Sequence, residues 1–286
     1  MKKIKYLIEF FFIIILFLIF KLLGYKAASN FGSFIVSILG PMFRSKKIIR
    51  NNIQKSLFLT DDNKISNIIN NMWSNYGRIL SDYIFIKNFR SGELDQYIKI
   101  EGNEILDKIK SEKKPVIFIS GHFNNFELMA MQIEKHGINV TAIYRPLNNI
   151  FLNKVMESIR VKYICKKQIK KGMSGIRQMI EFFKKDYSIA IMIDQRVSEG
   201  IHSNLFGRPA LTTTIPAQMV RKFGCDIVPV YIERINKLNY KMKVFKPITF
   251  RKEDSLEGIT NHLNHWLEKM IKNNPNQWIW THNRWK

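Results

Sequence analysis

The chain has 286 residues, and 46 lysines and arginines against 23 aspartates and glutamates give it a formal net charge of +23. Hydrophobic residues make up 46% and aromatic residues 13%, which excludes intrinsic disorder and a purely basic tail. Cys165 and Cys225 are too few for a disulfide scaffold, and neither belongs to a C-x-x-C motif typical of zinc or thiol chemistry. We therefore expect one good-sized domain with two reduced core cysteines.

The basic excess indicates a polyanionic partner, either nucleic acid or an anionic membrane with its lipids. Part of the excess has a simpler explanation, because many Lys, Ile and Asn residues are typical of coding in an AT-rich genome. Composition alone does not distinguish these explanations, so the N-terminal segment decides between the partners.

The N-terminal segment predicts a membrane anchor over residues 1–26. Every residue from Phe10 to Phe20 is apolar, and the run extends over residues 6–23 if one acid and one base near its ends are tolerated. That length is close to the minimum of roughly 17 residues that crosses a bilayer. A secretory signal peptide needs a small-residue A-x-A cleavage site, and the sequence after the run offers only adjacent alanines. We therefore favour an uncleaved anchor.

Positive charge on the two sides of the apolar run predicts its orientation. Three lysines precede the run, whereas a larger basic cluster follows it: Lys21, Lys26, Arg44, Lys46, Lys47 and Arg50. The larger cluster is expected to stay in the cytoplasm, which places the body of the protein there. If the segment lies in the interface rather than across the bilayer, the same charges lie against anionic headgroups.

Behind the anchor, hydrophobic periodicity predicts an α/β fold without internal repeats. Thr60, Asp61 and Asp62 indicate a helix start, and apolar residues recur at helical spacing as far as Tyr83, within a helical part over residues 27–100. Over residues 101–286, strands predicted at 115–119, 140–144, 188–193 and 227–232 alternate with helices predicted at 153–162 and 175–184. This alternation is typical of a single mixed, largely parallel sheet covered by helices. Reactive groups of such a sheet gather at the carboxyl ends of its strands.

The clearest chemical signal follows the first of these strands. The strand runs into Gly121 and His122, and a short turn leads to Glu127, where the apolar pattern becomes helical. The pair does not share a helical face, because residues five apart point about 140° away from each other on an ideal helix. From the first helical turn, however, Glu127 can reach back, hold one imidazole tautomer and stabilise the imidazolium that forms when His122 takes a proton. The alternative is a turn-capping His122 and an ordinary helix-start Glu127.

Three arginines follow predicted strands and can join the same rim. Arg145 follows the second strand, Arg196 follows Asp194 and Gln195 at the end of the third, and Arg208 lies in the loop beyond. The guanidinium fork matches the oxygens of phosphate and carboxylate groups, so these positions suit an acidic substrate. The alternative for each arginine is a solvated surface side chain.

Other chemistry has weaker support in the sequence. The G-x-S-x-G motif of serine hydrolases is missing. His262 and His265 form an H-x-x-H pair without a third ligand nearby in the sequence, so we expect no metal site. Tryptophans near basic residues could stack nucleobases, but such aromatics are commoner in cores and at membrane interfaces, so we expect no nucleic acid partner.

Residues 121–127, Gly-His-Phe-Asn-Asn-Phe-Glu, resemble the G-H-F-G-N-W-E signature of the bacterial lipid A biosynthesis acyltransferases. This lauroyl/myristoyl transferase family is related to the glycerolipid acyltransferases. The similarity covers nearly the whole chain and continues in order through residues 75–78, 144–149, 159–160, 194–195, 206–210, 275–280 and 282–284. Asn124 stands where the family has Gly, and we expect the turn to survive because Asn tolerates a left-handed backbone. Phe126 and Leu205 replace Trp and Phe of the family pattern, which bears on acyl chain length.

The resemblance implies a membrane-anchored enzyme of the bacterial inner membrane. It would transfer a fatty acyl group from an acyl carrier protein, with acyl-CoA as the alternative donor, to a hydroxyl of a phosphorylated, Kdo-bearing lipid A precursor. His122 would be the general base and Glu127 the residue that orients it. The substrate-binding residues would be Arg145, Arg160, Asp194, Gln195, Arg196, Gly207 and Arg208, with Arg145 the first choice for an oxyanion or a phosphate. Asp194 and Gln195 would support the geometry of the site, and we expect a monomer without a metal or cofactor.

Two other functions stay open on the sequence. Within the same enzyme class, the acceptor could be another glycolipid or a lysophospholipid. In a different class, the chain could be a membrane-tethered basic protein that binds polyanions, in which His122 and Glu127 are structural.

Overall fold

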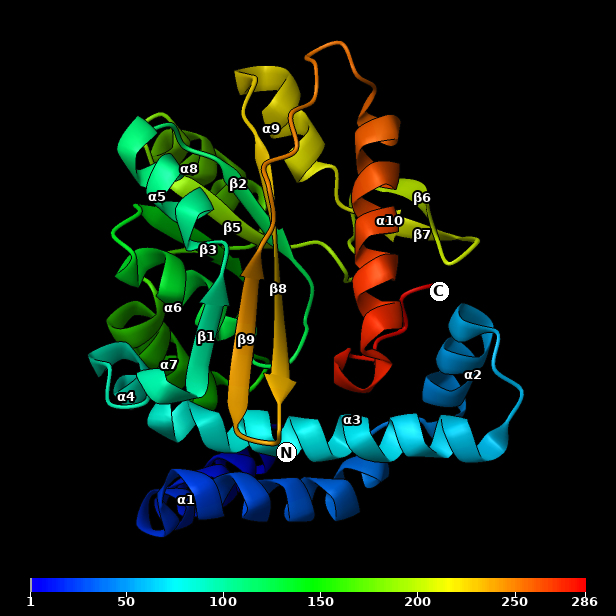
Figure 1. The fold of residues 1–286 in the computed structure, drawn as a ribbon. Coiled ribbons are helices and arrows are strands. Elements are labelled where there is room, and N and C mark those ends of the chain that lie inside the picture. Colours follow the sequence, from blue (N-terminus) through cyan, green and yellow to red (C-terminus); the bar gives the residue numbers. More distant parts are fainter. Residues whose placement is uncertain (1) are drawn as a thin grey trace.

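The protein is described here by a computed structural model of residues 2–286 (Figure 1). Its α-helices are α1 (Lys2–Leu39), α2 (Lys46–Leu57), α3 (Asp62–Asp82), α4 (Ile86–Ser91), α5 (Asn103–Glu112), α6 (Glu127–Lys135), α7 (Ile150–Ile159), α8 (Met173–Phe183), α9 (Ile215–Phe223) and α10 (Leu256–Asn273). Its strands are β1 (Ile98–Glu101), β2 (Ile117–Ser120), β3 (Val140–Tyr144), β4 (Lys167–Lys170), β5 (Ser188–Met192), β6 (Ile201–Leu205), β7 (Arg208–Thr212), β8 (Ile227–Ile235) and β9 (Asn239–Val244).

Seven strands form one sheet in the order β1-β9-β8-β2-β5-β3-β4. All neighbours are parallel except β8 and β9, which pair antiparallel. The remaining strands, β6 and β7, form a separate antiparallel hairpin beyond α10 (Figure 1). The predicted fold class, a single mixed and largely parallel sheet covered by helices, is confirmed.

The central strands are buried on both faces, and alternate residues of β2 point into two different cores. Phe118 packs with α5 and α6 on one face, whereas Ile117 and Ile119 pack with α8, α9 and α10 on the other. This burial explains why β2, β3, β5 and β8 were visible in the sequence as continuous apolar runs. Cys165 and Cys225 are free and buried, as expected, and burial raises the pKa of each thiol to about 12.

The helix predicted at 153–162 has different bounds in the structure. It begins at Ile150, because Asn149 caps it by accepting hydrogen bonds from the backbone N–H groups of Phe151 and Leu152. After Ile159 the helix widens into a π-helical turn, Arg160–Ile164. Such turns are frequent at functional sites, and this one carries a predicted site residue.

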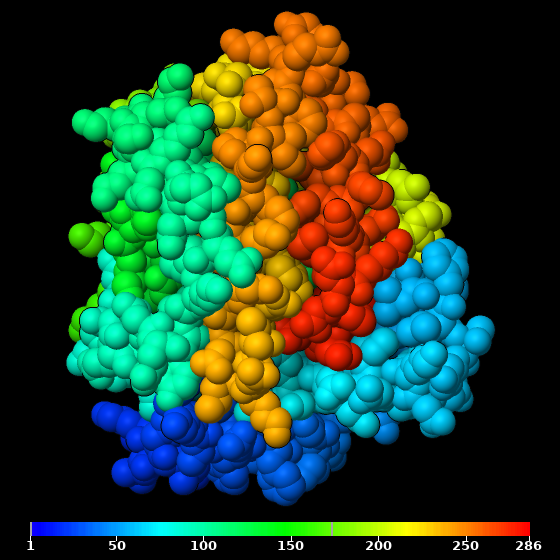
Figure 2. All heavy atoms as spheres, in the orientation of Figure 1, coloured from blue at the N-terminus to red at the C-terminus, as the bar shows by residue number. Residues whose placement is uncertain are grey.

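The N-terminal apolar run is the first half of α1, which bends sharply at Gly24 (φ 74°, ψ 166°). Both halves lie beneath α3 in Figure 1, and the outer face of α1 forms the lower edge of the molecule in Figure 2. The second half approaches α3 so closely that a Cβ on Gly77 would lie 2.0 Å from the carbonyl oxygen of Gly32. Among the described residues, this is the one helix long and apolar enough to cross a membrane, judged by length and composition.

Helix α3 crosses the carboxyl end of β8 (Figure 1). Its last residue, Asp82, is fully buried and accepts hydrogen bonds from Arg234 Nη2 at 2.6 Å and from Tyr240 Oη. Although burial opposes it, the charge of Asp82 raises the pKa of Arg234. The buried ion pair fixes α3, and with it α1, against the edge of the sheet where reactive groups are expected.

Candidate active site

The candidate active site lies at the carboxyl ends of β2 and β5, which are parallel neighbours. Ser120 and Met192 are partners in the register of these strands, and the next backbone N–H, that of Ile193, donates to Ser120 O at 2.9 Å. His122 and Asp194 follow at equivalent positions, so the register brings them level. His122 Nδ1 lies 2.7 Å from Asp194 Oδ1, and the backbone N–H of His122 donates to Asp194 Oδ2 at 2.7 Å.

The environment of this pair favours an ionised Asp194. Burial raises the pKa of Asp194, but the charge of His122, its two hydrogen bonds and the Trp278 indole N–H together hold this pKa below its ordinary value. An ionised carboxylate accepts the proton on Nδ1, which leaves Nε2 of the imidazole as the unprotonated nitrogen. The Gln195 side-chain nitrogen lies 3.3 Å from that Nε2, and the His122 side chain is 18% exposed. The site can therefore accept a proton from a bound group.

Glu127 has other partners than the expected one. Its Oε1 accepts hydrogen bonds from Arg160 Nε at 2.8 Å, from Arg160 Nη2 at 2.6 Å and from Tyr83 Oη at 2.8 Å. Among the described residues we find no hydrogen bond from Glu127 to His122, and the Phe126 ring packs edge-on against the imidazole instead. The Glu127 carboxylate therefore points toward Tyr83, which follows α3, and toward Arg160 in the π-helical turn. His122 thus bonds to Asp194, in place of the expected contact with Glu127.

Arg160 is committed to this cluster rather than left free for a substrate phosphate. Its guanidinium is buried, and although burial opposes it, Glu127 and Tyr83 raise its pKa. Burial and the nearby carboxylate raise the pKa of Tyr83, so this hydroxyl stays a donor. The cluster ties α6 to the end of α3 and to the π-helical turn, and it forms one wall of the site.

Arg145 and Arg196 are exposed at the same edge of the sheet. The backbone N–H of Arg196 donates to His282 Nε2 at 2.9 Å. Burial lowers the pKa of His282, and the charges of Arg284, His122 and Arg145 lower it further, whereas Asp194 opposes the shift. A neutral His282 suits the acceptor role of its Nε2. The guanidinium groups of Arg145 and Arg196 are therefore open to a ligand at this rim.

Gly207 and Arg208 lie in the β6–β7 hairpin, and Arg208 contacts other elements. Gly207 occupies the turn with φ 70°, a conformation that suits glycine. Arg208 Nη2 donates to Ser56 Oγ of α2 at 2.8 Å, and its guanidinium stacks 3.7 Å from the centre of the Trp285 ring. Burial lowers the pKa of Arg208. The structure does not bring these two residues into contact with His122.

The chain after α10 completes the site, which the residue pattern alone did not reveal. Trp278 Nε1 donates to Asp194 Oδ2 at 2.8 Å. Asn124 Nδ2 donates to Gln277 Oε1, and the Gln277 side chain exchanges hydrogen bonds with the backbone of Arg234. Asn124 adopts φ 47°, so the left-handed turn expected of this residue is confirmed. The density of amides and tryptophans over residues 275–280 was the available signal, since buried tryptophans need a hydrogen-bond acceptor.

Within residues 2–286, no group of three or more His, Cys, Asp and Glu side chains is placed so that it could hold a metal ion. On α10, His262 packs edge-on against Phe250, which precedes the helix.

Comparison with known proteins assigns the chain to a family. The family model described as bacterial lipid A biosynthesis acyltransferase matches residues 1–286. The chain is 25% identical to the lipid A biosynthesis lauroyltransferase of Escherichia coli (strain K12) over 199 residues, which cover 67% of this chain and 62% of that protein. It is 23% identical to lipid A biosynthesis acyltransferase 2 of Shigella flexneri over 187 residues, which cover 63% of this chain and 58% of that protein. The matches thus span less than two thirds of the length of either relative.

Proposed function

Because the chain belongs to the bacterial lipid A biosynthesis acyltransferase family, we propose that it transfers a fatty acyl group from an acyl carrier protein thioester to a hydroxyl of a lipid A precursor. This is a secondary acylation in lipopolysaccharide biosynthesis. The observation that carries the proposal is the His122–Asp194 pair, because it holds one imidazole nitrogen and leaves the other accessible to a hydroxyl.

In the proposed reaction, His122 Nε2 removes the proton of the acceptor hydroxyl while the hydroxyl oxygen attacks the thioester carbonyl carbon. The new C–O bond completes the ester as the C–S bond breaks, and the imidazolium returns the proton to the departing thiolate. Asp194 stabilises the imidazolium between these two transfers. Gln195 donates toward Nε2 in the resting site and is displaced by the acceptor hydroxyl.

The remaining side chains support this step through position and charge. Arg145 is the candidate for the thioester oxyanion or an acceptor phosphate, because it is exposed at the rim beside His282. Arg196 is the second candidate for the same reason. Glu127 serves as a positioning residue, since its hydrogen bonds with Arg160 and Tyr83 hold the first turn of α6 behind His122.

The enzyme is proposed to bind the cytoplasmic face of the inner membrane, with α1 lying in one leaflet. The first half of α1 exposes a row of large apolar side chains, whereas polar contacts fasten both halves to the body. Asn149 Nδ2 donates to Tyr6 O at 2.9 Å, Tyr25 Oη donates to Leu238 O at 2.9 Å, and Arg78 Nη1 donates to Ser29 Oγ at 3.0 Å. If the first half of α1 spanned the membrane, its contact with Asn149 would be broken and the buried inner face of α1 would be exposed. These contacts therefore support an interfacial arrangement.

Replacement of His122 by Ala tests the assignment of the base. We expect a folded, membrane-bound protein whose transfer rate falls by about 10²–10⁴-fold, the usual contribution of a general base. The measurement is mass spectrometry of the ester formed from acyl carrier protein thioester and the phosphorylated glycolipid. His265→Ala is the matched control, since that histidine is exposed on α10. Near-normal acylation by His122→Ala would contradict the proposal.

The same assay identifies the acceptor. A lysophospholipid offered beside the phosphorylated glycolipid competes for the same acyl donor, and acyl-CoA replaces the carrier thioester in a second series. The proposal expects the glycolipid ester and the carrier donor to dominate. A dominant lysophospholipid product would retain the acyl transfer but replace the acceptor.

A further inference from the structure

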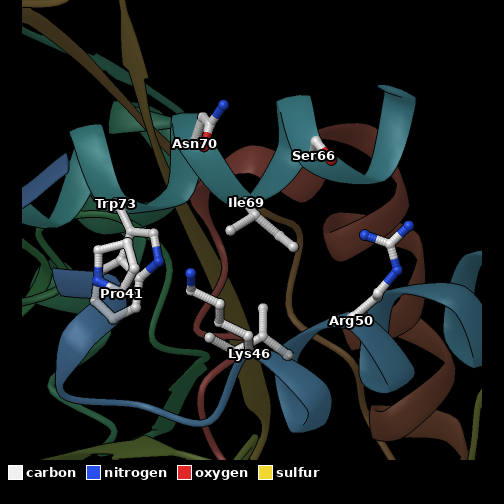
Figure 3. Close-up of a pocket in the computed structure, with 8 residues that line it drawn as sticks. Pro41, Lys46, Arg50, Ser66, Ile69, Asn70 and Trp73 are labelled. Atoms are coloured by element: carbon white, nitrogen blue, oxygen red, sulfur yellow. The ribbon is translucent and has the colours of Figure 1, made fainter. Parts of the chain in front are cut away.

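A pocket of about 270 Å³ lies between the start of α2, the middle of α3 and the turn that follows α1 (Figure 3). Pro41, Ile49, Ile69 and Trp73 give it an apolar floor, and Lys46 and Asn70 are among its polar lining residues. None of its lining residues belongs to the candidate active site. The pocket is therefore a separate feature that acyl transfer leaves unexplained.

The floor of the pocket holds an indole N–H without a partner. Trp73 is 7% exposed, and its Nε1 has no hydrogen-bond partner among the described residues. The ring packs tightly on Gly40, where a Cβ would lie 2.4 Å from a ring carbon. In Figure 3 the nitrogen faces the pocket interior on the side of Lys46. A buried, unpartnered donor that faces a pocket marks the place of an acceptor.

Positive charge surrounds the same point. Lys46 begins α2, and Figure 3 shows its ammonium group directed toward Trp73. Arg50 follows one turn later on the same helix and pairs with Asp62, so it contributes less net charge than Lys46. The positive end of the helix dipole adds to these side chains, and the lining of the pocket includes no acidic residue. These charges favour an anionic acceptor in the pocket.

Apolar surface continues from the mouth of the pocket. Met42 and Phe43 follow Pro41 and are 77% and 76% exposed. Phe43 also lines a second, shallower pocket with Ile4 and Ile8 of α1, which are 64% and 65% exposed. An anion that sits beside this surface is well matched if it carries acyl chains.

We propose that this pocket binds the phosphate headgroup of an anionic lipid. The phosphate oxygens accept hydrogen bonds from Trp73 Nε1 and from the Lys46 ammonium group, and the acyl chains lie along Met42 and Phe43. A phospholipid of the bilayer and the phosphorylated glycolipid acceptor carry the same chemistry. The inference rests on the membrane attachment proposed above, and it does not depend on the role of His122.

Fluorine NMR of the full chain labelled with 5-fluorotryptophan and purified in nonionic detergent tests the site. The Trp73 resonance is assigned by its loss in Trp73→Phe. Dihexanoyl phosphatidylglycerol should shift this resonance saturably, whereas dihexanoylglycerol, which has no phosphate, should not. Lys46→Ala should weaken the binding about tenfold or more, because a charge-assisted hydrogen bond is lost. Lys47→Ala is the matched control, since it removes the same charge from the neighbouring exposed position.

The outcomes separate the alternatives. An unmoved Trp73 resonance, equal weakening by Lys46→Ala and Lys47→Ala, or equal binding of dihexanoylglycerol would overturn the proposal. Tighter binding of the phosphorylated glycolipid than of phosphatidylglycerol identifies the acceptor as the ligand, and the reverse order identifies the bilayer. His122→Ala should bind the lipid unchanged while it loses transfer, so failure of this inference and failure of the proposed reaction are distinguishable.

Discussion

The imidazole of His122 is held on one side and accessible on the other. Four interactions stabilise the ionised form of Asp194: hydrogen bonds from the ring and the backbone N–H of His122, the charge that the ring acquires, and the hydrogen bond from the indole N–H of Trp278. Since Asp194 is buried and these contacts lower its pKa, the carboxylate stays ionised at neutral pH. This arrangement selects the tautomer with the free nitrogen toward the rim.

Replacing the two carboxylates separately shows which one orients the base. Asp194→Asn should lower transfer by about 10²–10⁴-fold, because the amide favours the wrong tautomer. Glu127→Gln should lower transfer less, since the Glu127 carboxylate bonds to Arg160 and Tyr83 rather than to His122. The measurement is the rate of ester formation by the two variants under the same conditions. A larger loss in Glu127→Gln than in Asp194→Asn would restore the orienting role that the sequence assigned to Glu127.

The sequence could predict which edge of the sheet carries the chemistry, but not all the pairs that form there. His122 and Asp194 both end apolar strands, so their common edge follows from the parallel arrangement. Glu127 also starts its helix where the pattern predicts. Its partners, Tyr83 and Arg160, come from distant parts of the chain, as does Trp278, and local periodicity holds no information about such contacts.

At the scale of elements, two glycines decide how the N-terminal segment meets the body. Gly32 of α1 and Gly77 of α3 bring the two helix backbones into contact, and the Ser33 and Ser74 hydroxyls hydrogen-bond beside them at 2.7 Å. The inner face of α1 buries aromatic residues such as Phe17 and Phe20 in the same core as α6. The contact therefore anchors α1 to the layer that lies over the active site.

Gly77→Ala should destabilise this contact, because the new Cβ would lie 2.0 Å from the backbone oxygen of Gly32. The expected loss is about 1–3 kcal/mol, which is typical of overpacking. Thermal unfolding in detergent measures the loss, and limited proteolysis shows whether α1 is released first. Gly258→Ala, on the exposed first turn of α10, is the control. Equal stability of the two variants would argue against the tight α1–α3 contact.

Strands that are apolar throughout were predictable from the sequence, whereas the amphipathic strand β9 and the separate β6–β7 hairpin were not. Strand β9 alternates lysines with buried residues and is antiparallel to β8, so it lacks the apolar run that revealed β2. The β6–β7 hairpin packs against α10 rather than in the sheet. The helix start at Asp61 and Asp62 was predictable because the cap is local: Asp61 accepts from the backbone N–H groups of Asn63 and Lys64.

For the whole molecule, in the membrane attachment proposed above, the bend at Gly24 determines on which side of the membrane the N-terminus lies. A helix across the bilayer puts the N-terminus and the body on opposite sides, whereas the folded-back α1 keeps them on the same side. The net charge of +23 fits the second arrangement, because basic residues near both ends of the apolar run would then meet the anionic surface of one leaflet.

Labelling with a membrane-impermeant maleimide distinguishes the two arrangements. Lys3→Cys should react only after spheroplasts are permeabilised, as should Lys185→Cys on the exposed surface of the body. The two native thiols are buried and serve as the background. Reaction of Lys3→Cys in intact spheroplasts, while Lys185→Cys stays protected, would establish a membrane-spanning α1.

Helix α3 lies between α1 and the carboxyl end of β8, and β2 ends further from α1 than β8 does (Figure 1). With α1 in the leaflet, as proposed above, the site at the end of β2 would stand above the lipid surface by at least the diameter of one helix, roughly 10 Å. The proposed enzyme would then acylate hydroxyls that rise that far above the leaflet and pass over those buried deeper. Regioselectivity would follow from the distance between the site and the lipid surface, in addition to any recognition of the sugar.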